Sequence, residues 1–335
     1  MAIPNGILSR TGRALAVAVT LGAGLLFLGN QASAADDWPE RPIQIVVSYG
    51  AGGASDRQAR LLAVPLEKAL GVPVVVQNMP GAGGQVAAVS LLRAPADGYT
   101  ILATNEPDLS MTAALKVSPY QYEDLDVMMV DVFDPRILLV KKDSPIKSFA
   151  DFVSKAKAEP DKLSISVAQG AAQELFAKWL VSSLGLKVRI VGFKGGGEAA
   201  TAMLGGHVTA TLGDDFGRLN IRSLSRALLL GAPKASPRWP EAQLLVDALK
   251  PYGVTPPTPG FLTRYGVYVV SSTFHKEHPD RYLKLQKAIA EAMHSKPFTE
   301  PIEKQGFSDL ALAEPGDKYK ETFAKTLSVI KELTK

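Results

Sequence analysis

The 335-residue sequence contains no cysteine. It therefore forms no disulfide, thiolate nucleophile, Cys-ligated zinc site or iron–sulfur cluster, and it offers no thiol to a bacterial lipid anchor. It also lacks the GxSxG, HExxH, GxGxxG and GK[ST] patterns of hydrolases, metallopeptidases and nucleotide-binding proteins. The 37 basic and 33 acidic residues nearly balance, which argues against nucleic acid as a partner. The sequence thus predicts no enzyme and no cofactor.

The N-terminal residues have the pattern of a targeting signal. Arg10 and Arg13 precede an apolar run at residues 14–28, and the small residues Ala32, Ser33 and Ala34 follow. This order predicts a secretory signal peptide over residues 1–34, cleaved after Ala34 or one residue later, with an uncleaved anchor as the alternative. Its removal takes away two arginines and no acid, so the formal net charge falls from +4 to +2. We expect a freely diffusing periplasmic protein without a lipid anchor.

The mature chain opens with two strand, glycine-loop, helix units. Residues 43–47 predict a buried strand, residues 48–56 a glycine-rich loop, and the spacing of Ala59, Leu62 and Leu66 a helix, with Pro65 kinking it. Ser55 or Asp56 is the expected N-cap. The pattern repeats with a strand at 72–77, a loop at 78–84 and a helix at 85–92, followed by a strand at 99–103. Such units predict a parallel sheet whose glycine loops present helix N-termini to an anion, unless the glycines only close tight turns.

The middle of the chain predicts a second α/β sheet. Strands are expected at 163–167, 188–193 and 208–212, alternating with helices at 149–156, 172–184 and 198–204. Residues 266–270 and the helices at 282–293 and 319–333 are expected to return to the first sheet. The composition, 46% apolar over 335 residues, is sufficient for two cores.

Ordered motifs then identify a family. These are residues 38–43 (WPERPI), 50–56 (GAGGASD), 80–84 (PGAGG) and 97–100 (DGYT), and later 160–164 (PDKLS), 169–170 (QG), 193–195 (FKG) and 203–206 (MLGG). Together they resemble the extracytoplasmic solute-binding proteins of tripartite tricarboxylate transporters, the Bug family. Met79 stands where the family usually has arginine, and Tyr49 lies in a segment that is usually richer in proline. These departures leave the identity of the ligand open.

The resemblance implies an α/β, two-lobed periplasmic-binding-protein fold of type II-like organisation, in which each lobe is a mainly parallel sheet covered by helices and hinged around a central cleft. Lobe 1 is expected to comprise residues 36–138 and 263–335, and lobe 2 residues 139–262. The ligand would be a small carboxylate (a dicarboxylate, tricarboxylate or aromatic carboxylate), delivered by a monomeric receptor to the large and small membrane subunits of the transporter. Two alternatives remain: a binding protein that presents the ligand to a sensor kinase, and a secreted α/β hydrolase.

The resemblance also implies the site. It places the ligand carboxylate in the first glycine loop and closes it with the loop before the second-lobe helix; the residues are Gly52, Gly53, Ala54, Ser55 and Asp56, and opposite them Gln169, Gly170 and Ala171. Further polar contacts are expected from Tyr49, Asn105 and Lys194, although Tyr49 could belong to the core and Lys194 to the solvated surface.

One acidic pair allows two interpretations. Asp214 and Asp215 follow a predicted strand and could act in metal or acid–base chemistry, or could form a turn with a helix cap. Asp215 is counted among the candidate ligand contacts, where it would favour a ligand with a donor or a cation. The four histidines have no metal-ligand spacing, so no metal site is predicted.

Overall fold

The computed structural model describes residues 1–2, 37–114 and 118–335. Apart from its first two residues, the predicted signal peptide lies outside this described part. Residues 41–335 form one compact unit. In the described residues, no helix combines the length and hydrophobicity needed to span a bilayer.

The first part of the unit is built on a mixed sheet, here called sheet A. Parallel pairing joins β1 to β2 and β3, as the strand–loop–helix pattern predicts, whereas β10 pairs antiparallel with both β3 and β4. Its strands are β1 (Ile43–Val47), β2 (Val74–Asn78), β3 (Thr100–Glu106), β10 (Thr263–Ser271), β11 (Ala311–Pro315) and the first part of β4 (Leu125–Lys141). The predicted return of the C-terminal segment to the first sheet is confirmed by the pairs that β10 and β11 make.

The second part of the unit is built on sheet B. Here β5 lies between β6 and β7 and is parallel to both. The strand β4 pairs antiparallel with β7 and with β8. Its strands are β5 (Ser164–Ala168), β6 (Arg189–Phe193), β7 (Ala210–Asp214), β8 (Ser225–Leu230), β9 (Gln243–Leu244) and the end of β4. Within the described residues β4 belongs to both sheets, so the strand order runs β2-β1-β3-β10-β4-β7-β5-β6.

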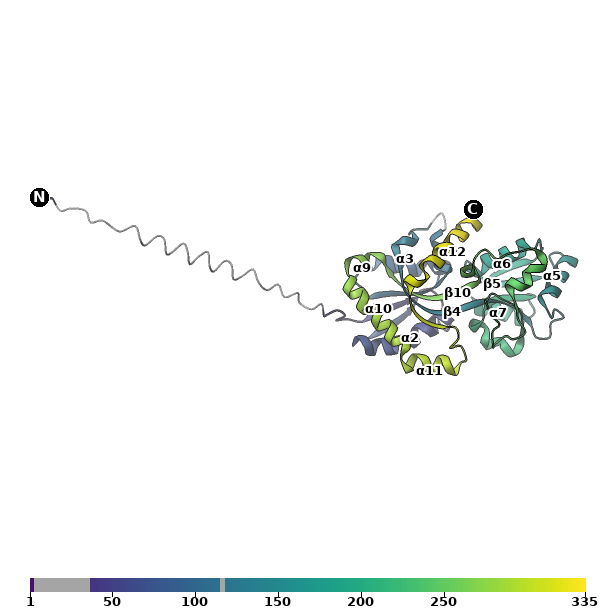
Figure 1. The fold of residues 1–335 in the computed structure, drawn as a ribbon, viewed down its shortest axis with the longest axis horizontal. Helices are drawn as coiled ribbons and strands as arrows, with labels where there is room; N and C mark the ends of the chain where they lie inside the picture. Colours follow the sequence, from purple (N-terminus) through teal and green to yellow (C-terminus); the bar gives the residue numbers. More distant parts are fainter. Residues whose placement is uncertain (3–36, 115–117) are drawn as a thin grey trace. The chain divides into compact units, whose positions relative to one another are not determined.

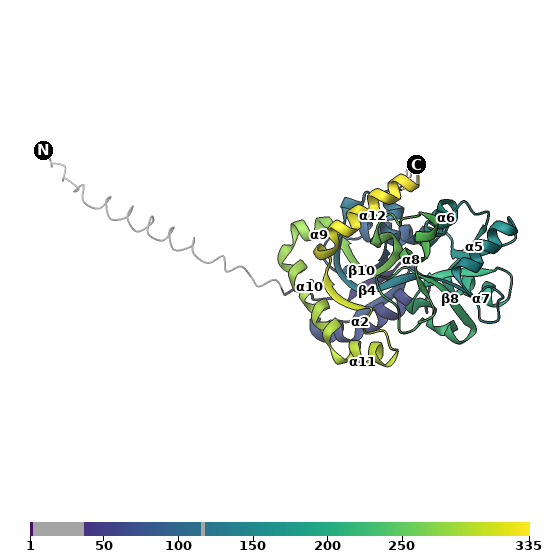
Figure 2. The ribbon, with the colours of Figure 1, turned by 45° about the vertical axis from the view of Figure 1, so that its right-hand side comes forward.

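Helices cover each sheet separately (Figures 1 and 2). Around sheet A lie α2 (Ala54–Leu70), α3 (Gln85–Arg93), α4 (Asp108–Ala114), α9 (Ser272–Glu277), α10 (Pro279–His294), α11 (Lys296–Lys304) and α12 (Lys320–Leu333). Around sheet B lie α5 (Phe149–Ala158), α6 (Ala172–Ser183), α7 (Gly196–Leu204) and α8 (Leu245–Leu249). The 3-10 helices are η1 (Ala82–Gly84), η2 (Tyr122–Asp124), η3 (Phe216–Leu224), η4 (Lys250–Tyr252), η5 (Pro259–Leu262) and η6 (Gly316–Tyr319).

Separate cores form under these helices. Leu102, Val130 and Phe323 belong to a buried cluster on sheet A. Phe149 and Phe176 belong to another on sheet B. A smaller cluster of Met111, Ala172 and Ile330 joins helices of the two sheets.

The start of α2 differs from the prediction. The N-cap residue is Gly53, whose backbone is extended, and the helix begins at Ala54. Neither Ser55 nor Asp56 caps it, because both already lie in its first turn, and their side chains make other contacts. The helix also continues through Pro65 to Leu70.

Candidate ligand-binding site

The first glycine loop joins β1 to α2. Gly52 has a φ of +77°, a conformation that favours glycine, and its amide donates to Asp56 Oδ2 at 2.8 Å. Gly53 donates its amide to the Gly50 carbonyl at 3.3 Å. Burial alone would raise the pKa of Asp56, but hydrogen bonds from Arg60, Gly52 and Asn78 outweigh it and hold that pKa below its usual value. The loop is therefore fixed by an ionised carboxylate, and Gly53 provides no side chain to cap the first-turn amides of α2.

The loop between β5 and α6 has the same construction. Gly170 has a φ of +72°, and its amide donates to Glu174 Oε2 at 2.8 Å. Glu174 is the third residue of α6, just as Asp56 is the third residue of α2. Burial would raise the pKa of Glu174, whereas Lys178 and the Gly170 amide lower it, with a net lowering. The two loops that were predicted to share a carboxylate are thus structural equivalents.

The loop before α6 lies against the second glycine loop of sheet A. A Cβ atom on Gly83, in the second glycine loop, would lie 2.5 Å from the Gly170 carbonyl oxygen, so only glycine allows this contact. Asp108 makes a second bridge: its Oδ1 accepts the Ala172 amide at 2.5 Å, and its Oδ2 accepts the Tyr49 hydroxyl at 2.5 Å. Burial and the charge of Asp108 raise the pKa of Tyr49 well above its usual value, which keeps the hydroxyl a donor.

A buried network of arginines and aspartates lies where β3, β4, β7 and β10 meet. The strand register places Arg264 opposite Asp134, and Arg136 opposite Asp214. Arg264 donates to Asp134 Oδ2 at 2.9 Å, and Arg136 donates to Asp214 Oδ1 at 2.6 Å. Burial raises the pKa of Asp134 to about 6, although Arg264 opposes the shift.

The network connects the first loop to the end of β7. Ser55 Oγ donates to Asn105 Oδ1 at 3.1 Å, and Arg264 Nη1 donates to the same oxygen at 2.9 Å. Asp134 Oδ1 accepts the Phe216 amide at 2.8 Å. Ser55 and Asn105, predicted from separate segments, are therefore brought together by the fold.

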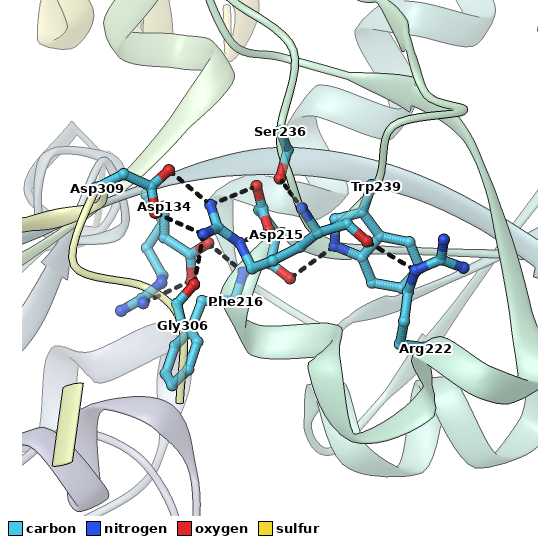
Figure 3. Close-up of polar contacts among 10 residues, drawn as sticks. Asp134, Asp215, Phe216, Arg222, Ser236, Trp239, Gly306 and Asp309 are labelled. Atoms are coloured by element: carbon cyan, nitrogen blue, oxygen red, sulfur yellow. Dashed lines mark hydrogen bonds and ion pairs between the residues drawn. The ribbon is translucent and has the colours of Figure 1, made fainter. Parts of the chain in front are cut away.

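Asp215 has a different environment from the one expected of a ligand contact. It is 1% exposed, and Arg238 donates to both of its oxygens, at 2.6 and 3.1 Å. The same guanidinium binds both oxygens of Asp309, also at 2.6 and 3.1 Å, and Figure 3 shows the two carboxylates converging from opposite sides. Asp215 stands at the N-cap position of η3, as the helix-cap interpretation predicts, but its side chain makes no cap hydrogen bond, and Asp214 binds Arg136.

The remaining predicted residues lie in the second part of the unit, two of them at its surface. Gln169 is exposed, and its side chain packs against Gly192. Lys194 is exposed as well, at the start of the loop that leads into α7. Ala171 is buried and is the N-cap residue of α6. In the described residues, no group of three histidine, aspartate or glutamate side chains could hold a metal ion.

Several polar residues of this region were missed by sequence reasoning. They are Asp108, Asp134, Arg136, Arg218, Arg238 and Arg264. A usable signal did exist for two of them, because Asp134 and Arg136 stand among the apolar residues of a strand, a position where charged residues are rare unless they are paired.

Comparison with solved structures defines the fold class. The chain has the two-lobed periplasmic-binding-protein fold. BugD, described as a periplasmic binding protein, superposes with a TM-score of 0.74 at 24% identity, covering 89% of this chain and 99% of that one. MatC from Rhodopseudomonas palustris, solved with bound malate, gives 0.73 at 22% identity, covering 89% and 100%. At these identities the structures establish the fold alone.

Sequence comparison defines the family. The model described as the tripartite tricarboxylate transporter family receptor matches residues 58–333, and the chain belongs to that family. Protein BugT of Bordetella pertussis is 32% identical over 280 residues, 81% of this chain and 82% of BugT. A Cupriavidus necator protein, named UPF0065 protein in the gbd 5′ region, is 36% identical over 197 residues. That match covers 58% of this chain and 60% of the relative, less than two thirds of its length.

Proposed function

We propose that this protein is a periplasmic receptor that binds a small carboxylate between two lobes and delivers it to the two membrane subunits of a tripartite tricarboxylate transporter. The lobes are residues 36–138 with 263–335, and residues 139–262. This division is supported by the separate cores of sheets A and B and by β4, which passes from one sheet to the other. The receptor acts as a monomer exported by its signal peptide, and it releases its ligand chemically unchanged.

The observation that carries this proposal is the matched pair of glycine loops. Each places a left-handed glycine before a helix N-terminus and fixes that glycine with the acid at the third helical position. Helix N-termini bind carboxylates through amides that point outward and through the partial positive charge of the helix. At α6 the amide of the first helical residue is already bonded to Asp108, so the α2 end is the one proposed to bind the carboxylate, and closure gains free energy where the ligand also contacts the other lobe.

The chemistry of the ligand is supported by the family's solved structures. MatC contains malate, and a Rhodopseudomonas palustris protein with a TM-score of 0.76 and 22% identity contains adipate. The carboxylate is proposed to bind at the first loop (Gly52, Gly53, Ala54, Ser55), where the Gly52 and Gly53 amides already donate within the loop and the amides of Ala54 and Ser55 act as the donors, with Asp56 holding the loop. The second loop (Gln169, Gly170, Ala171) is proposed to approach the ligand from the other lobe, with Tyr49, Asn105 and Lys194 at its margins, although its three amides already donate to Phe193, Glu174 and Ala168. Asp215 is proposed to act through Arg238, because its oxygens are already bonded.

The amide of Ala54 offers a sharp test. Ala54 is the first residue of α2, where proline is well tolerated, and Gly53 before it has the extended backbone that proline requires. Ala54→Pro therefore deletes one amide donor and keeps the helix. Ala54→Ser, which retains that donor, is the matched control.

The measurement is calorimetry with the best ligand from a thermal-shift panel of succinate, malate, adipate, citrate and benzoate. A hydrogen bond to a charged group contributes roughly 1.5–3 kcal/mol, so Ala54→Pro is expected to weaken binding by about 10- to 100-fold. Equal affinities in the two variants would mean that the carboxylate does not bind at this loop. If no member of the panel bound the wild-type protein, the proposed function itself would be wrong.

A further inference from the structure

Arg238 uses every hydrogen-bond donor of its guanidinium group. Nε and Nη2 donate to the two oxygens of Asp215, Nη1 and Nη2 donate to those of Asp309, and Nη1 also donates to the Gly306 carbonyl at 2.9 Å. These bonds, drawn as dashed lines in Figure 3, satisfy all the N–H groups that a guanidinium carries. Arg238, Asp215, Gly306 and Asp309 are here called the Arg238 bridge.

Other buried arginines of this region are less completely bonded. In the described part of the chain, the Nε atoms of Arg136, Arg218 and Arg264 have no hydrogen-bond partner. The Arg238 side chain is 7% exposed, and that of Asp309 is 35% exposed. Burial opposes the ionisation of Asp309, but Arg238 outweighs it and holds the pKa of this carboxyl below its usual value. The Arg238 bridge is therefore an ionised assembly with a more fixed geometry than a surface ion pair.

The bridge lies where two strands meet end to end along one edge of β4. The Asp215 amide, just after β7, donates to the Pro135 carbonyl at 2.8 Å. The Leu310 carbonyl, just before β11, accepts the Phe133 amide, also at 2.8 Å. Backbone groups two residues apart on a strand point to the same edge, so Phe133 and Pro135 face both strands from one side. The end of β7 and the start of β11 thus lie on either side of Asp134.

The Arg238 bridge closes the gap between these strands, and the gap is where the two proposed lobes meet. Asp215 and Arg238 belong to one lobe, and Gly306 and Asp309 belong to the other. The guanidinium is planar, and it holds both oxygens of each carboxylate in a two-bond fork, which fixes the direction of the carboxylates as well as their distance. A change in the angle between the lobes at β4 must therefore break at least one fork.

The bridge also adjoins the first glycine loop. The ring of Phe216, which follows Asp215, packs on the ring of Phe307, with centroids 3.7 Å apart. The Arg57 guanidinium lies 5.9 Å from the centroid of the same Phe216 ring, and its Nη1 donates to the Gly52 carbonyl at 2.6 Å. A displacement of Phe216 would therefore reach the loop that is proposed to bind the carboxylate.

We propose that Arg238 is a positioning residue of this receptor, which fixes the angle between the two lobes through its two forks. The angle that it fixes is the one at which the loop before α6 lies against the second glycine loop. The inference rests on the proposed function and deepens it, because it identifies what keeps the receptor in its binding-competent arrangement. Ligand affinity then depends on Asp309, a residue outside the proposed carboxylate site.

The angle between the lobes can be measured without a ligand. The chain contains no cysteine, so Val64→Cys in α2 and Ser183→Cys in α6 provide two unique attachment points for spin labels. Both positions are exposed, and each belongs to a different lobe. Double electron–electron resonance on the full mature protein then gives the distribution of distances between the labels.

The variants remove one fork at a time. Asp309→Ala deletes the fork that crosses between the lobes and leaves Arg238 paired with Asp215. The ligand-free distance distribution is expected to broaden and to extend to longer distances. Asp97→Ala is the matched control, because it breaks a 2.7 Å ion pair with Arg41 inside one lobe, and its distribution should equal that of the wild type.

Ligand affinity provides the second readout, measured by calorimetry with the tightest binder among succinate, malate, adipate, citrate and benzoate. Apparent affinity falls in proportion to the binding-competent fraction, so Asp309→Ala is expected to bind about tenfold more weakly and Asp97→Ala within about twofold of the wild type. A purely structural role of Asp309 would instead lower the unfolding temperature and leave the distance distribution unchanged.

The outcomes are distinct. An unchanged distribution in Asp309→Ala, or equal broadening in Asp97→Ala, overturns the inference. If Asp309→Ala does not fold, Arg238→Lys takes its place: lysine keeps the charge beside Asp215 but cannot form two forks, so the same broadening is expected, and its absence overturns the inference. If none of the five acids binds the wild type, the proposed function is wrong, while the ligand-free distances still decide the role of Arg238.

Discussion

The N-termini of α2 and α6 are alike in backbone and unlike in what occupies them. Both follow a glycine with positive φ, and both have an acid at the third helical position that accepts the amide of that glycine. At α6, the carboxylate of Asp108 accepts the amide of the first helical residue, Ala172. The corresponding amide of α2, on Ala54, follows an N-cap glycine that supplies no side chain.

The difference shows what a helix N-terminus in this protein can bind. At α6 the chain itself places a carboxylate on the helix end, and it does so with a residue of the other sheet. That contact is an internal example of the interaction proposed for the ligand at α2. It also makes Asp108 a link between the two parts of the molecule, because it bonds both Tyr49 and Ala172.

Removal of the Asp108 side chain is expected to give the largest change in the free energy of unfolding. Asp108 is 4% exposed and accepts two hydrogen bonds of 2.5 Å, from Tyr49 and from Ala172. Asp108→Ala leaves both donors buried without an acceptor. At roughly 1.5–3 kcal/mol for each bond to a charged group, the free energy of unfolding should fall by about 4 kcal/mol. Urea denaturation of the ligand-free protein measures this change.

Asp143→Ala is the matched control, because Asp143 is exposed and its nearest cation, Lys141, is 3.7 Å away. A surface pair of this kind contributes at most about 1 kcal/mol. If the two variants lost the same stability, the contact between Asp108 and α6 would not stabilise the folded protein.

The contrast between the N-termini of α2 and α6 also shows which local features of the fold can be predicted from the sequence. The repeated strand, glycine loop and helix predicted both loops because hydrophobic spacing and glycine are local signals. The cap was misplaced because the extended backbone of Gly53 starts α2 earlier than the side chains suggested.

The arginine network was not predictable for a different reason. Arg136 and Asp214 are 78 residues apart, and Arg264 and Asp134 are 130 apart. They meet only through the register that β4 adopts against β7 and β10. No local pattern encodes that register, so the charged residues could be noticed in the sequence but not paired.

The second prediction concerns pH and the base of the helix that carries Asp108. Glu106 ends β3 and accepts hydrogen bonds from Ser110 and Tyr122. Burial raises its pKa to about 7, against partial opposition from those bonds. Because the folded-state pKa lies above the unfolded value of about 4.3, its contribution to stability is fully present below that value and is lost as the pH rises through 7.

The side chain in Glu106→Gln cannot titrate, so this variant should lack the pH-dependent part of the stability that Glu106 provides. Between pH 5 and pH 8, the free energy of unfolding of the wild type is expected to fall by about 3 kcal/mol more than that of the variant, at about 1.4 kcal/mol per pKa unit. Chemical denaturation at several pH values gives the dependence of the free energy of unfolding on pH for the wild type and for the variant. Parallel slopes would show that Glu106 is ionised in the folded protein at pH 5.

The smallest expected effect compares the two helix starts directly. Proline at the first helical position deletes one amide and is compatible with both helices, since Gly53 and Ala171 are both extended. Ala172→Pro removes a donor that Asp108 uses and should lower the free energy of unfolding by about 2 kcal/mol. Ala54→Pro removes a donor that only the ligand is proposed to use, so its stability should change by less than about 1 kcal/mol while its ligand affinity falls more than that of Ala172→Pro. Denaturation gives the stability of both variants and calorimetry gives their ligand affinity. Equal losses of stability would mean that the folded chain bonds the first amide of α2 as it bonds that of α6, and the proposed difference between the two helix N-termini would be wrong.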